Sequence, residues 1–144
     1  MNLLAYDLGN RYGWAHLDGN EITHGHAAAK SALHFFETAD DVIFTLRPDA
    51  VLFENAGFQR GIPGRKWNDK RAALEMACER NEVMCHGVAV STIKKHVTGS
   101  GRACKNEVIA AVQNRGYEVA DDNEADALAL LLYAIDTNLV EVGE

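Results

Sequence analysis

Cysteine is scarce in this chain, and what there is forms no recognisable framework. The three cysteines, Cys78, Cys85 and Cys104, include no C-x-x-C pair and have no histidine at a zinc-ligand spacing, which argues against a zinc site or a disulfide scaffold. We therefore expect Cys78 and Cys85 to be small buried hydrophobic side chains in a reducing compartment. His24 and His26 share one face of a predicted strand without a third ligand, so we interpret them as surface residues or residues with a local partner.

Long apolar segments are also absent. No stretch approaches the roughly 20 apolar residues of a membrane-spanning helix, and the N-terminus lacks the basic and apolar regions of a signal peptide. We expect a cytoplasmic protein with no membrane partner. A length of 144 residues is enough for a hydrophobic core, so we expect one domain over residues 1–144.

Basic residues are few, and most of them are confined to two segments. The formal net charge is −7, yet residues 58–71 hold five basic residues against one acid, and residues 94–106 hold four against none. A charged cluster is usually only a solvated surface, but two cationic segments on an acidic protein indicate placed phosphate contacts. The candidate DNA contacts in these segments are Arg60, Arg65, Lys66, Lys94, Lys95 and Arg102.

Two acidic residues stand at the ends of predicted buried strands. Apart from Asp7, residues 3–8 are apolar or aromatic on both sides of the strand alternation. This pattern is typical of a central strand covered on both faces. The short apolar run at residues 50–53 ends at Glu54, and we expect it to pair parallel to the first strand. Asp7 could simply cap the following turn. An ionised carboxylate in apolar surroundings is nevertheless costly unless a cation or several donors face it.

A third acid lies in an otherwise apolar helix. From residue 125 to 135 every residue except Asp126 is Ala, Leu, Tyr or Ile, so this helix should be buried. Asp121 and Glu124 are explained as acids that cap the helix and complement its dipole. The helical neighbours of Asp126 include Asp122 and Asn123 and no cation. Several oxygens without a basic partner are typical of a site for a hard divalent cation.

The three acids Asp7, Glu54 and Asp126 therefore suit two Mg²⁺ ions, for which Mn²⁺ could substitute. Two such ions about 3.5–4 Å apart activate water and stabilise the leaving 3′-oxygen of a phosphodiester. Hydrolysis in this way leaves 5′-phosphates.

The periodicities predict a mixed α/β sandwich with the order β-β-β-α-β-α-β-α-α-α. Three antiparallel strands precede two parallel ones in a five-stranded sheet flanked by helices on both faces. Residues 55–69 are rich in glycine and basic residues, and we expect a mobile loop there. In it Phe58 should stack on bases, whereas Trp67 could either stack or anchor the loop to the core. The small and apolar surface of the helix at residues 70–81 predicts a subunit interface, and Ser91 is the expected cap of a short helix at 92–97.

Four motifs resemble those of a known family. They are Tyr-Asp-Leu-Gly at 6–9, Phe-Glu-Asn at 53–55, Ile-Lys-Lys-His-Val-Thr-Gly-Ser-Gly-Arg-Ala-Cys-Lys at 93–105 and Glu-Ala-Asp-Ala-Leu-Ala at 124–129. In this order they resemble the RuvC-type Holliday junction resolvases of the RNase H-like superfamily, particularly the short phage versions. The Asp-x-Gly opening is shared by many phosphate-handling folds, and the other motifs are more specific.

The resemblance implies an RNase H-like fold, a homodimer, and roles for several residues. Asp7, Glu54 and Asp126 would be metal ligands, Lys94 and Lys105 would contact or support junction phosphates, and Phe58 would wedge into the crossover. The family often has an Asp or His three residues before the final Asp, where this chain has Asn123 beside Asp122. Either could be the fourth group of the metal site, and we favour Asn123. A phage protein would act in the host cytoplasm.

The leading hypothesis is a Mg²⁺-dependent, structure-selective endonuclease that resolves four-way or branched DNA. A nuclease acting on RNA or RNA–DNA hybrids is the nearest alternative within the same chemistry. A non-catalytic junction-binding protein is a second alternative, suggested by Asn123 in place of an acid. An actin-like or sugar-kinase ATPase shares the Asp-x-Gly opening but requires two lobes, for which this chain is too short.

Overall fold

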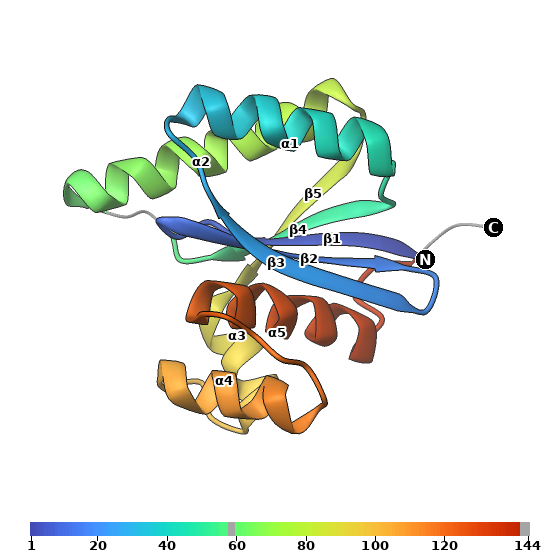
Figure 1. Ribbon diagram of the computed structural model, residues 1–144, viewed down its shortest axis with the longest axis vertical. Helices are drawn as coiled ribbons and strands as arrows, with labels where there is room; N and C mark the ends of the chain where they lie inside the picture. Colours follow the sequence, from blue (N-terminus) through green and yellow to red (C-terminus); the bar gives the residue numbers. More distant parts are fainter. Residues whose placement is uncertain (58–59, 142–144) are drawn as a thin grey trace.

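A five-stranded mixed sheet with the strand order β3-β2-β1-β4-β5 organises the chain (Figure 1). The computed structural model describes residues 1–57 and 60–141. The central strand β1 pairs antiparallel with β2 and parallel with β4, and β5 continues the parallel half. The strands are β1 (Asn2–Asp7), β2 (Arg11–Asp18), β3 (Glu21–Ala28), β4 (Ala50–Asn55) and β5 (Met84–Ala89). The predicted element order and the predicted division into antiparallel and parallel strands are confirmed.

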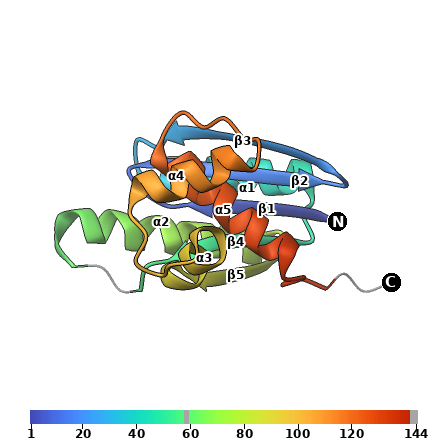
Figure 2. The same ribbon diagram turned by 90° about the horizontal axis from the view of Figure 1, so that it is seen from below.

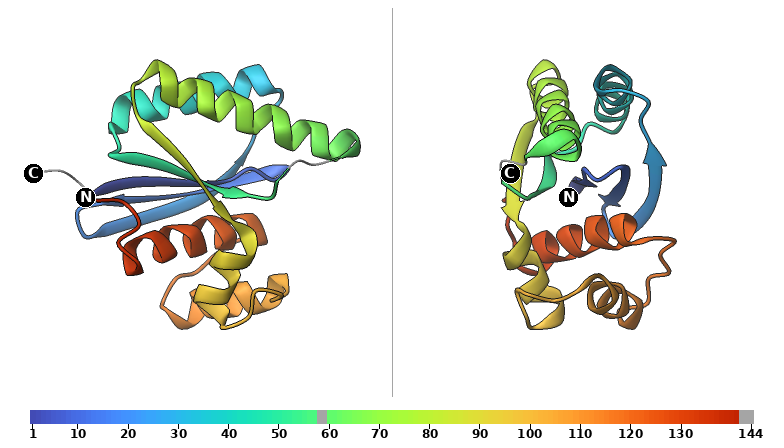
Figure 3. Two further views of the ribbon diagram at one scale, coloured as in Figure 1. Left: turned by 180° about the vertical axis from the view of Figure 1, so that it is seen from behind. Right: turned by 90° about the vertical axis from the view of Figure 1, so that its left-hand side faces the viewer.

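The helices form layers on both faces of this sheet. The helices are α1 (Ala32–Leu46), α2 (Gly61–Arg80), α3 (Val90–Thr98), α4 (Lys105–Asn114) and α5 (Asp122–Asp136). Helices α1 and α2 cover one face, α5 covers the other, and α3 and α4 lie beyond α5 (Figures 1 and 3). Within the described residues, no helix combines the length and the apolar character needed to cross a bilayer.

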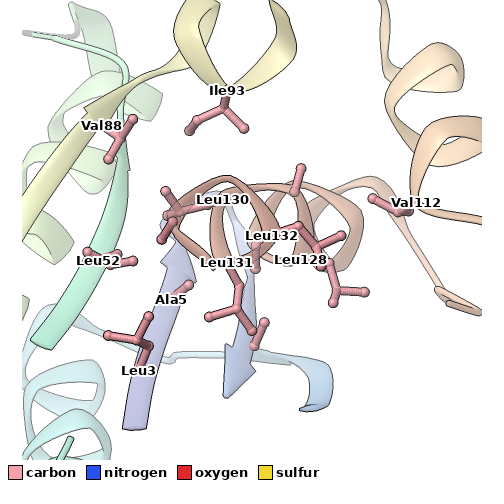
Figure 4. Packing of buried hydrophobic residues seen from close by; sticks show 14 of the residues in the cluster. Leu3, Ala5, Leu52, Val88, Ile93, Val112, Leu128, Leu130, Leu131 and Leu132 are labelled. Atoms are coloured by element: carbon pink, nitrogen blue, oxygen red, sulfur yellow. The ribbon is translucent and has the colours of Figure 1, made fainter. Parts of the chain in front are cut away.

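The alternating side chains of β1 build two separate cores. Leu3 and Ala5 face α5, whereas Leu4, Tyr6 and Leu8 face α1 and α2, as the period of two of a strand requires. Figure 4 shows the leucines of α5 between the sheet and the outer helices, with Val112 of α4 on the far side. These residues of α5 are almost completely buried, as predicted: Ala125, Ala127, Leu128, Ala129, Leu130, Leu131 and Leu132.

Side-chain caps are present at the starts of α1 and α5 and absent at the start of α3. The Ser31 side chain accepts a hydrogen bond from the backbone N–H of His34 at the start of α1, and Asp121 accepts one from Glu124 at the start of α5. The expectation that Ser91 caps the short helix α3 is wrong. Helix α3 begins at Val90, two residues before the expected start at residue 92, and it has no side-chain cap.

The predicted loop at residues 55–69 is also corrected. Helix α2 begins at Gly61, so the second half of the expected loop is helical, and the helix predicted at 70–81 is the C-terminal half of α2. Pro63 lies in the first turn, where its missing N–H costs no hydrogen bond. Trp67 packs against the core on the α1 and α2 side, and this tertiary contact outweighs the weak helix propensity of the segment. The N-terminal turns of α2 extend past the sheet (Figure 2).

Candidate active site

Three carboxylates from distant parts of the chain meet at one edge of the sheet. Asp7 ends β1, Glu54 lies near the end of the parallel strand β4, and Asp126 lies near the start of α5. Because neighbouring parallel strands end at the same edge, the first two acids are brought together by the register of β1 and β4. One carboxylate oxygen from each of the three residues lies within 4.8 Å of those of the other two. Such a group of hard oxygen donors fits a divalent cation.

The electrostatics of this cluster show what neutralises it. Burial raises the pKa of Asp7, opposed by a hydrogen bond from the Gly9 N–H to Asp7 Oδ1 at 2.8 Å. Burial and then the charge of Asp7 raise the pKa of Glu54 to about 8. Burial and then the charges of Glu54 and Asp7 raise the pKa of Asp126 to about 9. The cluster therefore holds protons near neutral pH, and a divalent cation would take their place.

The two candidates for a fourth ligand have different surroundings. A Cβ built on Gly9 would lie 2.6 Å from Asn123 Oδ1 and 3.1 Å from Asp7 Oδ1, so these two oxygens lie on the same side of Gly9. Asp122 instead has Oδ2 at 3.1 Å from Lys105 Nζ. Asp122 also lies near the cluster, since its charge contributes to the raised pKa of Asp7 and of Asp126. Asn123 differs in that its side-chain oxygen shares one side of Gly9 with Asp7 Oδ1.

A cleft of about 480 Å³ opens beside this cluster. Lys105 of α4 and residues from the N-terminal part of α2 line it together with the turn after β1. The two basic segments of the sequence thus reach one cleft. Its described lining is Leu8, Gly9, Asn10, Ala56, Arg60, Gly64, Lys66, Trp67, Lys70, Lys105, Asp122 and Asn123.

The remaining predicted DNA contacts are not part of the described lining of this cleft. Lys94 is half-buried on α3, and its charge opposes the burial and the Asp7 charge that raise the pKa of Glu54. The other predicted DNA contacts outside the lining of the cleft are exposed: Arg65, Lys95 and Arg102. Phe58 lies outside the described residues. Trp67 is half-buried, packs against the core and also lines the cleft, so it anchors this segment beside the cleft.

Lys70 lies beside the acid cluster, a position that the sequence does not reveal because Lys70 is one of five basic residues in the segment 58–71. Lys70 is only 8% exposed, and its Nζ donates hydrogen bonds to the carbonyl oxygens of Leu8 and Gly9. The helical periodicity around Lys70 could have predicted its burial. Trp67 and Leu74 lie three residues before and four residues after Lys70, on a face that is otherwise apolar.

The start of α5 is also fixed by a contact that the sequence did not reveal. Glu124 is 5% exposed, and its Oε2 lies 2.7 Å from His24 Nδ1 on β3. Its role is therefore to tie α5 to the sheet, beyond the helix-dipole role that we expected. The interpretation of His24 as a residue with a local partner is correct.

Comparisons with known proteins agree with this geometry. No family model matches the chain. A protein of Geotalea uraniireducens (strain Rf4) described as crossover junction endodeoxyribonuclease RuvC is 28% identical over an aligned length of 155 residues. The alignment covers 90% of this chain and 85% of that protein.

Solved structures of junction resolvases share the fold. Thermus thermophilus RuvC superposes with a TM-score of 0.73 at 20% identity, covering 96% of this chain and 97% of that one. The same protein in complex with a Holliday junction substrate gives a TM-score of 0.76 at 19% identity, covering 96% and 94%. The yeast mitochondrial Holliday junction resolvase Ydc2 superposes with a TM-score of 0.60 at 10% identity, covering 89% of this chain and 76% of that one. The RNase H-like fold and the resemblance to RuvC-type resolvases are therefore confirmed.

Proposed function

We propose that this chain is a divalent-metal-dependent endonuclease that resolves Holliday junctions or other branched DNA. The observation that carries the proposal is the convergence of Asp7, Glu54 and Asp126 beside a cleft lined by basic residues. The sequence relative described as a crossover junction endodeoxyribonuclease supports the choice of substrate. A role on RNA–DNA hybrids uses the same acids, and a comparison of junction, plain duplex and hybrid as substrates separates the two.

In this proposal, the acidic residues of the site bind metal and the lysines bind phosphate. Asp7, Glu54 and Asp126, with Asn123 as the fourth group, would hold two Mg²⁺ ions, or Mn²⁺ in their place. Bound ions of this kind lower the pKa of water and stabilise the leaving 3′-oxygen, so the product carries a 5′-phosphate. Lys105 and Lys94 hold the phosphates next to the acid cluster. Since Asn123 is neutral, these four residues would hold the metal with three formal negative charges.

DNA binding is proposed to extend from this cleft. Arg60 and Lys66 line it, and the exposed side chains of Arg65, Lys95 and Arg102 would contact phosphates farther along the arms. Phe58 would stack at the crossover. These contacts are mostly to the backbone, so the affinity should depend strongly on salt.

A homodimer fits a substrate with two opposed strands to cut, because a twofold axis presents the same site to both. We propose that the single nuclease domain of residues 1–144 dimerises through the helix at 70–81. Helix α2 exposes large apolar side chains there and near its start, with Met76 at 59% and Ile62 at 73% exposed.

The decisive experiment compares wild type with Asp7→Asn on a 5′-labelled four-way junction in Mg²⁺. Loss of even an outer partner of a metal ligand costs about 10–100-fold, so loss of Asp7 should slow cleavage by at least about 100-fold. Junction affinity should persist or rise, because the change removes a negative charge near phosphate. Asp41→Asn, at an exposed position of α1, is the matched control. Undiminished cleavage by Asp7→Asn would refute the proposal, and binding without nicking by wild type would support the non-catalytic alternative.

A further inference from the structure

Lys70 combines a charge with a degree of burial that lysine rarely reaches unless it is paired. Among the described residues, the buried charged side chains are Asp7, Lys70 and Glu124. Burial lowers the pKa of Lys70, the charge of Asp7 acts in the opposite sense, and Lys66 adds to the lowering. Desolvating this ammonium is costly for folding. Its interactions therefore identify what the lysine does.

Among the described residues, the hydrogen bonds of the Lys70 ammonium are to the segment that follows Asp7. The Nζ of Lys70 donates to the Leu8 carbonyl at 3.3 Å and to the Gly9 carbonyl at 2.5 Å. The N–H of the same Gly9 donates to Asp7 Oδ1 at 2.8 Å. The Cα of Gly9 also lies against Asn123, since a Cβ there would meet Asn123 Oδ1 at 2.6 Å. One residue, Gly9, thus connects Lys70 to two of the oxygens that face the acid cluster.

We propose that Lys70 is a positioning residue for the metal site. Its ammonium fixes the Leu8–Gly9 backbone from the α2 side, and this backbone in turn orients the carboxylate of Asp7 and the side-chain oxygen of Asn123. Metal ligands that are held in place before binding lose less conformational freedom when the ion arrives. The inference rests on the proposed function, because it assumes that these oxygens bind a divalent cation.

The same helix offers a matched control. Lys66 lies one turn before Lys70 and lines the same cleft, but it is exposed. Lys66→Met and Lys70→Met each remove one positive charge close to the site. If Lys70 acts only through its charge, both changes should affect metal binding alike. If it positions the turn, only Lys70→Met should.

The test measures Mn²⁺ binding to the DNA-free protein by electron paramagnetic resonance and by calorimetry. We expect Lys70→Met to weaken Mn²⁺ binding by about tenfold, in the range of other outer-shell partners of metal ligands, while its junction affinity changes less than about threefold. We expect Lys66→Met to do the reverse, with weaker junction binding and unchanged Mn²⁺ affinity. Equal effects of the two substitutions on Mn²⁺ binding, or none from Lys70→Met, would overturn the proposal.

Two further variants keep the result interpretable. Circular dichroism and thermal unfolding establish whether Lys70→Met folds; if it does not, Lys70→Arg decides, because it keeps the charge but changes the donor geometry. Wild-type Mn²⁺ affinity in Lys70→Arg would then overturn a positioning role, and a loss of affinity would support it. Asp7→Asn tests the underlying site: if it leaves Mn²⁺ binding unchanged, the proposed metal site itself fails, whichever result Lys70 gives.

Discussion

The side-chain oxygen of Asn123 lies so close to Gly9 that a Cβ on that glycine would approach it to 2.6 Å. The backbone oxygen of Asn123 lies even closer to β2, where a Cβ on Gly13 would lie 2.0 Å from it. Two glycines on either side of one turn thus allow the start of α5 to dock against the sheet. This docking places Asp126 and Asn123 beside Asp7.

Asn123 should contribute to metal binding more than Asp122 does. Asn123→Ala removes an oxygen beside Asp7, so we expect Mg²⁺-dependent cleavage at saturating junction to fall by about tenfold or more. Asp122→Ala removes the partner of Lys105 and should cost less than about threefold. Asn123→Asp restores a charged ligand and should raise the affinity for Mg²⁺, measured by titration of the cleavage rate. A larger loss from Asp122→Ala than from Asn123→Ala would reverse this assignment.

The stability of the metal-free protein should fall as the pH rises. Burial raises the pKa of Glu54 from 4.5 to about 8 and that of Asp126 from 3.8 to about 9, so the folded state holds protons that the unfolded chain releases. This contribution to stability is complete below about pH 4 and is lost as the pH rises through about 8 to 9. Thermal unfolding in EDTA across this range measures it. Added Mg²⁺ replaces the protons, so its stabilising effect should grow with pH.

Glu54→Gln provides the control for that titration. It should raise the free energy of unfolding of the metal-free protein near pH 8.5 by more than about 1 kcal/mol, since one unit of pKa shift corresponds to about 1.4 kcal/mol. Glu37→Gln, on the exposed side of α1, should leave the pH dependence unchanged. A metal-free melting temperature that increases between about pH 5 and pH 9 would contradict the assigned protonation.

Lys94 and Lys105 should contribute to the salt dependence of junction binding. If each contacts a backbone phosphate, Lys94→Ala and Lys105→Ala should each flatten the log–log slope of affinity against salt by roughly one unit. Fluorescence anisotropy measures the junction affinity, and an Asp7→Asn background in every variant prevents cleavage during the titration. Arg115→Ala is the control, because Arg115 bonds Asp136 at the opposite end of α5. Unchanged slopes in both lysine variants would exclude phosphate contacts.

Met76 should lie in the dimer interface. Replacing this exposed apolar side chain with Glu places a charge in the proposed contact, so Met76→Glu should shift sedimentation from dimer to monomer with little change in thermal stability. Leu33→Glu changes a similarly exposed apolar residue of α1, at 65% against 59% for Met76, and should leave the dimer intact. A wild-type protein that sediments as a monomer at micromolar concentration would remove the basis of this prediction.

The sequence by itself determined the sheet and the acid cluster. Strand β1 is apolar on both faces and the apolar run of β4 is followed by Glu54, so their parallel pairing places Asp7 and Glu54 at the same edge. The apolar run of α5 after Asp126 required this helix to be buried against the sheet, with Asp126 near its start. These features follow from local periodicity and from the geometry of parallel strands, which is why they could be predicted without coordinates.

Tertiary structure alone decided which polar side chains near the cluster face it. The burial of Lys70, the pairing of Asp122 with Lys105 and the contact of Asn123 with Gly9 all join residues from different elements. The helical start of α2 at Gly61 depends in the same way on the packing of Trp67. Neither periodicity nor propensity reports the rotation of a helix about its axis or its distance from a neighbouring turn. Those quantities are set by packing, and they determine which oxygens and ammonium groups meet.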